Sequence, residues 1–305
     1  CSGKLLAATR GILQNIFSMW YPELNRVPVR AQIADRCAVK PGVISFFSGG
    51  VDGLHTLIRR KDEITHLVSV QGIDVQVEND RLWQEALRAN KEMADLFGKK
   101  LVPIQTNIRH WSHPRGVNWK RFHGAGLASL AHLLGMQRCY IASSHTYSDL
   151  MPLGSHPVSD LHWSSDNVEL IHDGVESTRS DKLRMISAYP EALERLRVCW
   201  MDAAYNCGEC EKCMRTRIAL RALGLATTTL PRLDSLAALK KMTIWDESKM
   251  AFLDDNYRLA IAAGDHELAS ALRSCQRSYH IRHALAELDE YLLGNVIRKF
   301  KRILS

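Results

Sequence analysis

The chain has no apolar run that approaches the roughly 20 residues a helix needs to cross a bilayer. It also has no low-complexity segment and no fixed internal period, which argues against a repeat architecture. Residues 5–20 are interrupted by polar side chains and do not resemble a signal peptide. With 305 residues, 46% hydrophobic and 24% charged, the composition is that of an ordinary soluble enzyme. We therefore expect a cytoplasmic protein without a membrane partner.

The charge balance is modestly basic. The net charge is +7 and the sequence pI is about 9.0, which favours anionic ligands such as nucleotides. We expect much of the excess to lie near the C-terminus, at Arg298, Lys299, Lys301 and Arg302. Such a segment can contact nucleic acid or anionic lipid. A solvated helix end that complements the helix dipole is the interpretation we favour, so nucleic acid is a possible but not a favoured partner.

A glycine turn follows the first strongly apolar segment. The apolar residues 43–47 end abruptly in Ser48-Gly49-Gly50-Val51-Asp52-Gly53, and a helix-compatible segment, residues 54–60, comes next. This order predicts a buried parallel strand, a tight turn and a helix. Adjacent glycines let main-chain amides face a ligand, and the first N–H groups of a helix add to such an anion site. The alternative is a plain turn without a ligand.

The string Ser-Gly-Gly-Val-Asp after a hydrophobic strand resembles the PP-loop of the N-type ATP pyrophosphatases. In that family the loop holds the pyrophosphate end of ATP, and the substrate attacks the α-phosphorus to form an AMP adduct. The family usually has serine or threonine after the aspartate, where this chain has Gly53. The resemblance therefore implies an ATP site with one hydroxyl fewer, and either weaker nucleotide binding or an altered role.

Strand and helix patterns alternate beyond the glycine turn. We expect strands over 64–70, 100–105 and 137–142, with helices over 80–97 and 123–134 between them. An amphipathic helix over 5–19 and a strand over 27–33 are expected before the turn. The alternation predicts an α/β fold with a doubly wound, mostly parallel sheet. The carboxyl ends of its strands should bring the glycine turn, Gln71-Gly72 and Ser143-Ser144-His145 to one crevice.

Four of the eight cysteines lie within fifteen residues, at Cys199, Cys207, Cys210 and Cys213. Clustered cysteines in an intracellular enzyme indicate a metal before disulfides. Zinc in a closed structural site is the occupant we favour. An iron–sulfur cluster is the alternative, because Cys-x-x-Cys-x-x-Cys also suits a cubane. A further alternative is that the four cysteines are reduced structural residues that bind no metal.

The glycine turn and the cysteines together resemble the cyano-deazaguanine synthase family of queuosine-precursor enzymes. That family carries a structural zinc and uses ATP to convert a carboxylate to an amide and then a nitrile, with ammonia as nitrogen source. The resemblance covers roughly residues 40–220 and implies an ATP-dependent ligase with ATP, Mg²⁺ and Zn²⁺ as cofactors. Sulfur transfer to a nucleobase on the same scaffold, and a non-catalytic nucleotide- or nucleic-acid-binding module, are the alternatives.

A long polar segment between the fourth strand and the cysteines is the expected substrate pocket. Loops of this length in a compact domain are usually functional. A solvated surface loop is the alternative. Tyr147 and Trp163 can stack on a planar ring of a small-molecule or nucleobase-like substrate. The pocket residues that we select are His145, Tyr147, His156, Asp160, Trp163, Asp173 and Arg179.

Three residues are expected to support the chemistry. Lys182 resembles the basic residue that PP-loop enzymes bring to the phosphates from a late helix, where charge develops on the leaving pyrophosphate. Asp52 suits a Mg²⁺ ligand or a helix cap, and Ser48 offers a hydroxyl donor. The full set expected to bind ATP is Ser48, Gly49, Gly50, Val51, Asp52, Gly53, Gln71 and Gly72.

The sequence also predicts how the chain is divided. Residues 1–40 form a lead-in, 41–190 a nucleotide-binding α/β domain, 191–225 the four-cysteine segment and 226–305 a helical region rich in Ala and Leu. The helical region is a possible surface for a homodimer.

Overall fold

The computed structural model describes residues 2–33, 38–201, 203–242, 244 and 247–293. The chain divides into two compact units, and each is described by itself. The first unit comprises Cys1–Cys213 together with Thr227–Leu230, and the second comprises Met214–Ala226 together with Pro231–Ser305. The division therefore falls directly after the last cysteine of the cluster, within the helix α10 (Glu211–Ala222).

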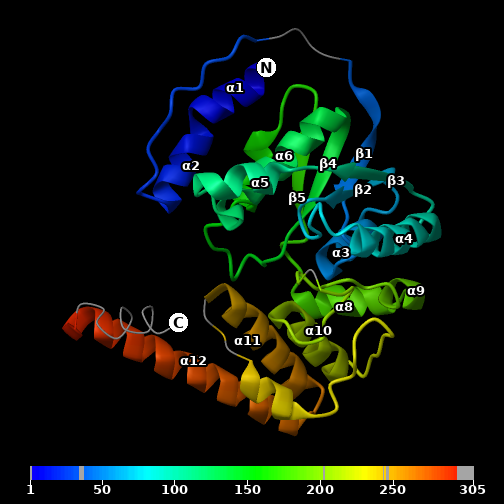
Figure 1. Cartoon of the computed structure of the whole chain (residues 1–305), viewed down its shortest axis with the longest axis vertical. Helices are drawn as coiled ribbons and strands as arrows, with labels where there is room; N and C mark the ends of the chain where they lie inside the picture. Colours follow the sequence, from blue (N-terminus) through cyan, green and yellow to red (C-terminus); the bar gives the residue numbers. More distant parts are fainter. Residues whose placement is uncertain (1, 34–37, 202, 243, 245–246, 294–305) are drawn as a thin grey trace. The chain divides into compact units, whose positions relative to one another are not determined.

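The first unit is built on a five-stranded, all-parallel sheet, which confirms the predicted α/β class. The strands are β1 (Lys40–Phe46), β2 (His66–Gln71), β3 (Lys100–Gln105), β4 (Met136–Ala142) and β5 (Glu169–Asp173). Their order in the sheet is β3-β2-β1-β4-β5 (Figure 1). The order reverses between β1 and β4, and ligands of such sheets bind beyond the carboxyl ends of the strands at this reversal.

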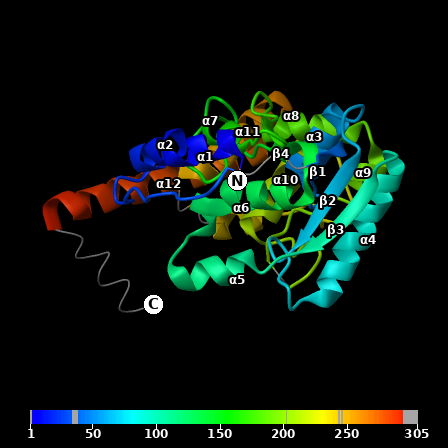
Figure 2. The ribbon, with the colours of Figure 1, turned by 90° about the horizontal axis from the view of Figure 1, so that it is seen from above.

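Helices cover both faces of the sheet. Leu170 of β5 lies in a core cluster with Ala128 and Ala131 of α6 (Trp119–Leu134). Asp173, three residues further along β5, instead contacts α3 (Val51–Arg59) through Thr56. Residues an odd number apart in a strand point to opposite faces, so α6 and α3 lie on opposite sides of the sheet. The helix α4 (Asp80–Leu96) runs along β2 and β3 (Figure 2).

The N-terminal segment differs from its prediction. Two helices, α1 (Gly3–Arg10) and α2 (Ile12–Trp20), replace the single expected helix, and they meet at Gly11. The expected strand over 27–33 is wrong, because this segment has no regular structure. Side chains of the two helices hold its backbone instead. Arg10 donates to the carbonyl of Val29, and Gln14 exchanges two hydrogen bonds with the backbone of Val27.

The segment expected as one long loop contains regular structure. It includes α7 (Pro157–Asp160), a 3₁₀ turn η2 (Leu161–Trp163) and the strand β5. Sequence analysis missed β5 because the strand is only five residues long and ends in the polar pair His172-Asp173. After it, α8 (Arg179–Ser187) begins with a capping box between Thr178 and Asp181.

The remaining described elements are short connections and the helices of the second unit. In the first unit they are α5 (Ile108–Ser112), η1 (His113–Arg115) and α9 (Pro190–Leu193); in the second, η3 (Leu236–Lys241), α11 (Glu247–Ala262) and α12 (His266–Leu293). The second unit has its own core, which includes Ile218, Leu253, Leu268 and Leu272. Within the described part of the chain, no helix combines the length and apolarity that crossing a membrane requires. The basic residues 298–302 lie outside the described residues.

Candidate functional site

The glycine turn after β1 has the geometry of an anion site. Gly49 adopts φ +78°, and a Cβ atom there would lie 2.9 Å from Oδ1 of Asn90, so only glycine fits without strain. Gly50 is the N-cap of α3 and offers no side-chain hydrogen bond to the helix. The first N–H groups of α3 are therefore left for a ligand, and Ser48 beside them is exposed.

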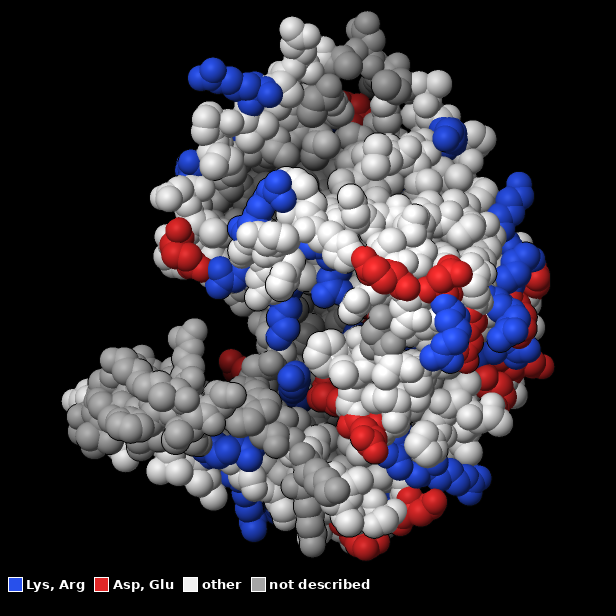
Figure 3. All heavy atoms as spheres, in the orientation of Figure 1, with Lys and Arg blue, Asp and Glu red and all other residues white. Residues whose placement is uncertain are grey.

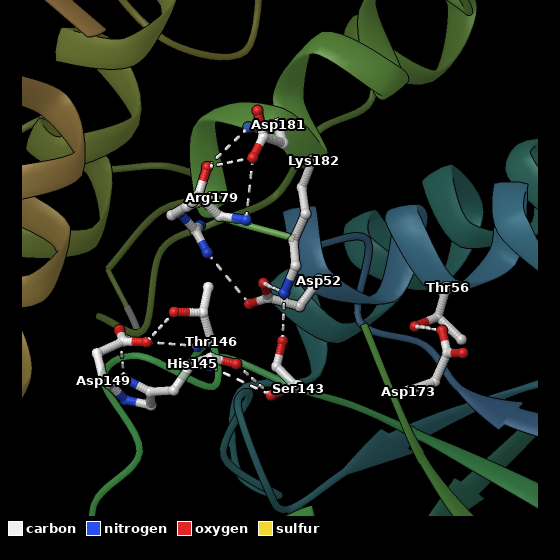
Figure 4. Close-up of polar contacts among 11 residues, drawn as sticks. Asp52, Thr56, Ser143, His145, Thr146, Asp149, Asp173, Arg179, Asp181 and Lys182 are labelled. Atoms are coloured by element: carbon white, nitrogen blue, oxygen red, sulfur yellow. Dashed lines mark hydrogen bonds and ion pairs between the residues drawn. The ribbon is translucent and has the colours of Figure 1, made fainter. Parts of the chain in front are cut away.

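Two cations from α8 reach the start of α3. Nζ of Lys182 lies 3.0 Å from Oδ1 of Asp52, and Nη1 of Arg179 lies 3.1 Å from Oδ2. Lys182 also donates to the carbonyl of Ser143, at 2.6 Å, just beyond β4 (Figure 4). The Lys182 side chain is only 2% exposed and that of Arg179 7%. The fold thus brings together Asp52, Arg179 and Lys182, all selected from the sequence, at the strand-order reversal.

A third cation, Arg197, was missed by the sequence analysis. Its backbone N–H donates to the carbonyl of Gly49 at 2.9 Å, so the segment before the cysteines packs on the glycine turn. Arg197 is only 3% exposed, yet Nε and Nη2 of its guanidinium have no hydrogen-bond partner. Nε of Arg179 is buried and unpaired in the same way. Buried charged groups are costly without a counter-charge, so this surplus of cations suits an anionic ligand.

His55 lies one turn into α3 beside these cations. It is 1% exposed, and neither ring nitrogen has a hydrogen-bond partner. Burial, and next the charge of Lys182, lower the pKa of His55 to about 4. The ring is therefore neutral at pH 7 and adds no charge to the site.

The other residues expected to bind ATP are placed differently. Val51 is buried. A Cβ atom at Gly53 would meet Phe47 and the carbonyl of Phe46 at 3.5 Å or more, so a larger residue fits there. The side chain of Gln71 donates to the carbonyl of Val77 at 3.0 Å, and the Gly72 amide donates to the carbonyl of Val75. Gln71 and Gly72 thus fold the β2–α4 loop and offer no free side-chain donor.

Two of the expected pocket residues follow β4 near the cations. Ser143, the acceptor of Lys182, donates its hydroxyl to the carbonyl of His145 at 2.7 Å. Nδ1 of His145 lies 3.3 Å from Asp149. Although burial acts to raise it, the pKa of Asp149 is lowered by hydrogen bonds from His145 and Thr146. Tyr147 is 69% exposed, which leaves its ring accessible.

His156 and Asp160 belong to a separate cluster at α7, together with two residues that were not selected. The buried carboxylate of Asp160 accepts from Ser155 at 2.6 Å and contacts Nδ1 of His172 at 2.7 Å. The ring of His156 lies 4.8 Å from that of Trp20. His172 belongs to the face of β5 opposite to that of Asp173, so this cluster lies on the α6 side of the sheet.

The last two pocket residues have structural contacts. Trp163 packs against the hydrophobic core between the sheet and α6 and near Phe17, so it is not placed to stack on a ligand. Asp173 accepts from Thr56 at 3.0 Å and from Arg60 at 2.8 Å. It ties the end of β5 to α3, to one side of the Asp52 contacts (Figure 4).

The four cysteines form one compact group. The sulfur atoms of Cys199, Cys207, Cys210 and Cys213 all lie within 4.8 Å of one another. The separations are 3.8 Å between Cys199 and Cys210 and 3.9 Å between Cys207 and Cys213. Two sulfurs bound to one tetrahedral ion at about 2.3 Å are roughly 3.8 Å apart. The group can therefore hold a single metal ion without rearrangement, whereas a four-iron cluster placed between the sulfurs would separate them further.

The thiols of this group differ in acidity. A hydrogen bond from the Cys213 side chain lowers the pKa of Cys210 to about 4, and the same contact raises that of Cys213. Backbone N–H groups support the sulfurs, from Met201 to Cys199 at 3.3 Å and from Cys210 to Cys207 at 3.2 Å. Outside the group, Cys139 is fully buried in β4, and burial raises its pKa.

Comparisons with known proteins add no family to this geometry. No family model matches the chain, and neither the curated proteins nor the solved structures contain a significant match.

Proposed function

We propose that this protein binds ATP at the glycine turn and acts as an adenylating ligase of the cyano-deazaguanine synthase type. The resemblance of residues 48–52 to a PP-loop motivates the nucleotide. The observation that carries the proposal is the group of buried cations around that turn. Arg179 and Lys182 both pair with the carboxylate of Asp52, and Arg197 keeps two buried guanidinium nitrogens without a hydrogen-bond partner.

Charge favours a phosphate ligand here. A triphosphate presents several negative oxygens, and the amides at the start of α3 together with three cations can donate hydrogen bonds to them. The dipole at the N-terminus of α3 acts in the same direction. Because Arg197 and Arg179 each keep buried nitrogens without a partner, phosphate oxygens would supply hydrogen bonds that the protein alone lacks.

The chemistry has two steps. An oxygen of the acceptor carboxylate or carbonyl attacks the α-phosphorus, the bond to the bridging α–β oxygen breaks, and pyrophosphate leaves with its electron pair. An amine or ammonia nitrogen then attacks the acceptor carbon whose oxygen carries the AMP group, loses a proton and displaces AMP. Lys182 is suited to neutralise charge on the leaving pyrophosphate, and Ser48 can donate its hydroxyl. Bound Mg²⁺ would neutralise phosphate charge, with Asp52 as the available carboxylate.

The cysteine group is proposed as a structural zinc site. Four thiolates that surround one ion leave no open position for a substrate. The segment between α9 and Cys199 carries Arg197, whose backbone hydrogen-bonds to Gly49. A metal that fixes the first cysteine would therefore hold this arginine against the glycine turn.

Two alternative functions, sulfur transfer and nucleotide binding without catalysis, can be weighed at particular residues. Sulfur transfer requires a reactive thiol near the nucleotide, and the burial and raised pKa of Cys139 do not favour it in that role. A non-catalytic nucleotide-binding module is favoured only by Gly53, which removes one hydroxyl from the cradle.

Binding and turnover are tested separately. ATP with Mg²⁺ should raise the melting temperature of the protein, and Lys182→Met and Arg197→Met should reduce this increase. Lys91→Met is the control, because Lys91 pairs with Asp95 on the exposed side of α4. Pyrophosphate release with candidate carboxylic acids and ammonia then distinguishes a ligase from a binding module. Absence of any ATP-dependent stabilisation in the unmodified protein would contradict both.

A further inference from the structure

The excess of positive charge is concentrated in one part of the sequence. From Leu96 to Ser148 the chain has no aspartate or glutamate but contains seven lysines and arginines: Lys99, Lys100, Arg109, Arg115, Lys120, Arg121 and Arg138. The rest of the chain carries equal numbers of acidic and basic residues. This acid-free segment therefore carries a charge equal to the whole net charge of +7, and the residues near the C-terminus are not its main source.

Most of its middle part is exposed on α5, η1 and the first turn of α6. We define the α5 surface as Arg109, Trp111, Arg115, Lys120 and Arg121, all of which are exposed. Blue lysine and arginine side chains lie among uncharged residues on the face that carries α5 (Figure 3). Trp111 is 53% exposed, so its ring is accessible to a ligand.

Arginines and aromatic rings alternate on this surface. The guanidinium of Arg115 lies 4.8 Å from the ring centre of Trp111, and that of Arg109 lies 5.8 Å from the ring centre of Trp119. These cation–π contacts hold each guanidinium group over a tryptophan ring. A ring that stays exposed beside cations is the arrangement that binds an unpaired base next to its phosphate.

The acidic residues that face this surface come from other elements. Glu23 pairs with Arg121 at 2.5 Å, and Glu78 lies 3.7 Å from His110. Among the described residues, Arg109 and Arg115 contact no carboxylate. They contact backbone carbonyls instead, that of Ile73 and that of Trp111.

We propose that the α5 surface binds single-stranded nucleic acid. Cations spaced over α5, η1 and α6 would contact successive phosphates, and Trp111 would stack on one base. A duplex pairs and stacks its bases internally and leaves none for this ring. An acidic peptide would use the cations but has no planar group for Trp111. No residue of this surface belongs to the glycine turn or to the Asp52 contacts, so the proposal does not require that the protein use ATP.

Fluorescence anisotropy of the full-length protein with labelled U12 RNA and dT12 DNA tests the proposal. Trp111→Ala should weaken binding about tenfold, the effect of losing one stacked base. The triple variant Arg109→Gln, Arg115→Gln, Lys120→Gln should make the salt dependence shallower by about 2 in log–log slope, because each lost phosphate contact contributes roughly 0.7. Tyr291→Ala is the control for an exposed aromatic ring, since Tyr291 is 88% exposed in the second unit. The triple variant Arg81→Gln, Arg88→Gln, Lys91→Gln on α4 is the control for charge.

The outcomes separate the explanations. Losses confined to the α5 surface variants, with unchanged thermal unfolding and unchanged α4 and Tyr291 controls, support the proposal. Equal binding of a 12-base-pair duplex, or an equal effect of the α4 variant, would show a non-specific charge effect and overturn it. Binding of polyglutamate as tight as that of U12 would assign the surface to an acidic protein instead.

Discussion

Nζ of Lys182 and Oδ1 of Asp52 lie 3.0 Å apart, although the two residues are 130 positions apart in the sequence. Each comes from the first turn of a helix, α8 and α3 respectively. Asp52 also accepts from Arg179, so one carboxylate orients two buried cations. This arrangement holds both cations at the start of α3.

Asp52→Asn should therefore destabilise the protein. It leaves two buried cations without their carboxylate, which costs about 3 kcal/mol of unfolding free energy. Pyrophosphate should recover part of the loss, and should stabilise this variant more than the unmodified protein. Urea unfolding with and without pyrophosphate measures both effects. A concentration of about 10 mM is enough to saturate a site with a dissociation constant of about 1 mM. Asp95→Asn on the exposed side of α4 should change stability little.

Gly53→Ser is expected to strengthen nucleotide binding without loss of stability. A Cβ atom at this position makes only ordinary contacts, at 3.5 Å and beyond, and serine is a better helix residue than glycine by about 0.5 kcal/mol. The added hydroxyl would lie in the first turn of α3, where it can donate to a phosphate. Calorimetric titration with ATP measures the affinity.

Gly49→Ser is the matched comparison. The positive φ and the 2.9 Å approach to Asn90 predict strain that lowers stability by more than 1 kcal/mol. The outcome that would contradict the first of these two predictions is an ATP affinity of Gly53→Ser equal to or lower than that of the unmodified protein. In that case the phosphates would not lie at this turn.

Local sequence patterns were sufficient to locate some parts of the candidate site. The strand–turn–helix pattern located the glycine turn, and the cysteine spacing located four residues that can hold a metal ion. Both are local signals, since a few neighbouring residues suffice to produce them. The α/β alternation likewise predicted four of the five strands, because each is an apolar run between turn residues.

Arg197 could not be recognised in this way. Nothing in its neighbourhood, Leu196-Arg197-Val198, distinguishes it from an ordinary arginine in an apolar segment. Its role follows from a backbone hydrogen bond to Gly49, nearly 150 positions earlier. The expected pocket residues do not all lie together, for a related reason. The segment 143–173 was interpreted as one loop, but β5 sends His172 and Asp173 to opposite faces of the sheet.

The neutral His55 predicts a loss of stability in acid. Its pKa is about 4 in the folded protein and about 6.5 in an unfolded chain. As the pH falls, His55 therefore takes up a proton in the unfolded chain before it does so in the folded protein. The contribution of the neutral ring to the free energy of unfolding is complete above about pH 6.5 and is lost between pH 6.5 and pH 4. The loss is on the order of 2–3 kcal/mol. Urea unfolding from pH 7.5 to 4.5 should show a shallower slope for His55→Leu. His110→Leu, at an exposed position, should retain the slope, and equal slopes in both variants would contradict the assignment.

Removal of the metal should destabilise the first unit more than any single surface change. We expect one zinc per chain by elemental analysis and a colourless protein, because zinc has no visible absorption band. Chelation at neutral pH should lower the melting temperature, and Cys210→Ser should reproduce the loss, since four thiolates around one ion contribute directly to folding free energy. Cys275→Ser, a half-buried cysteine outside the group, should leave the zinc content at one.

A brown protein with iron and sulfide would instead show that the sulfurs move apart from the 3.8 Å spacing of Cys199 and Cys210 to enclose a cluster. If metal loss also weakened ATP binding, the effect would be transmitted through Arg197, whose segment links the first cysteine to the glycine turn.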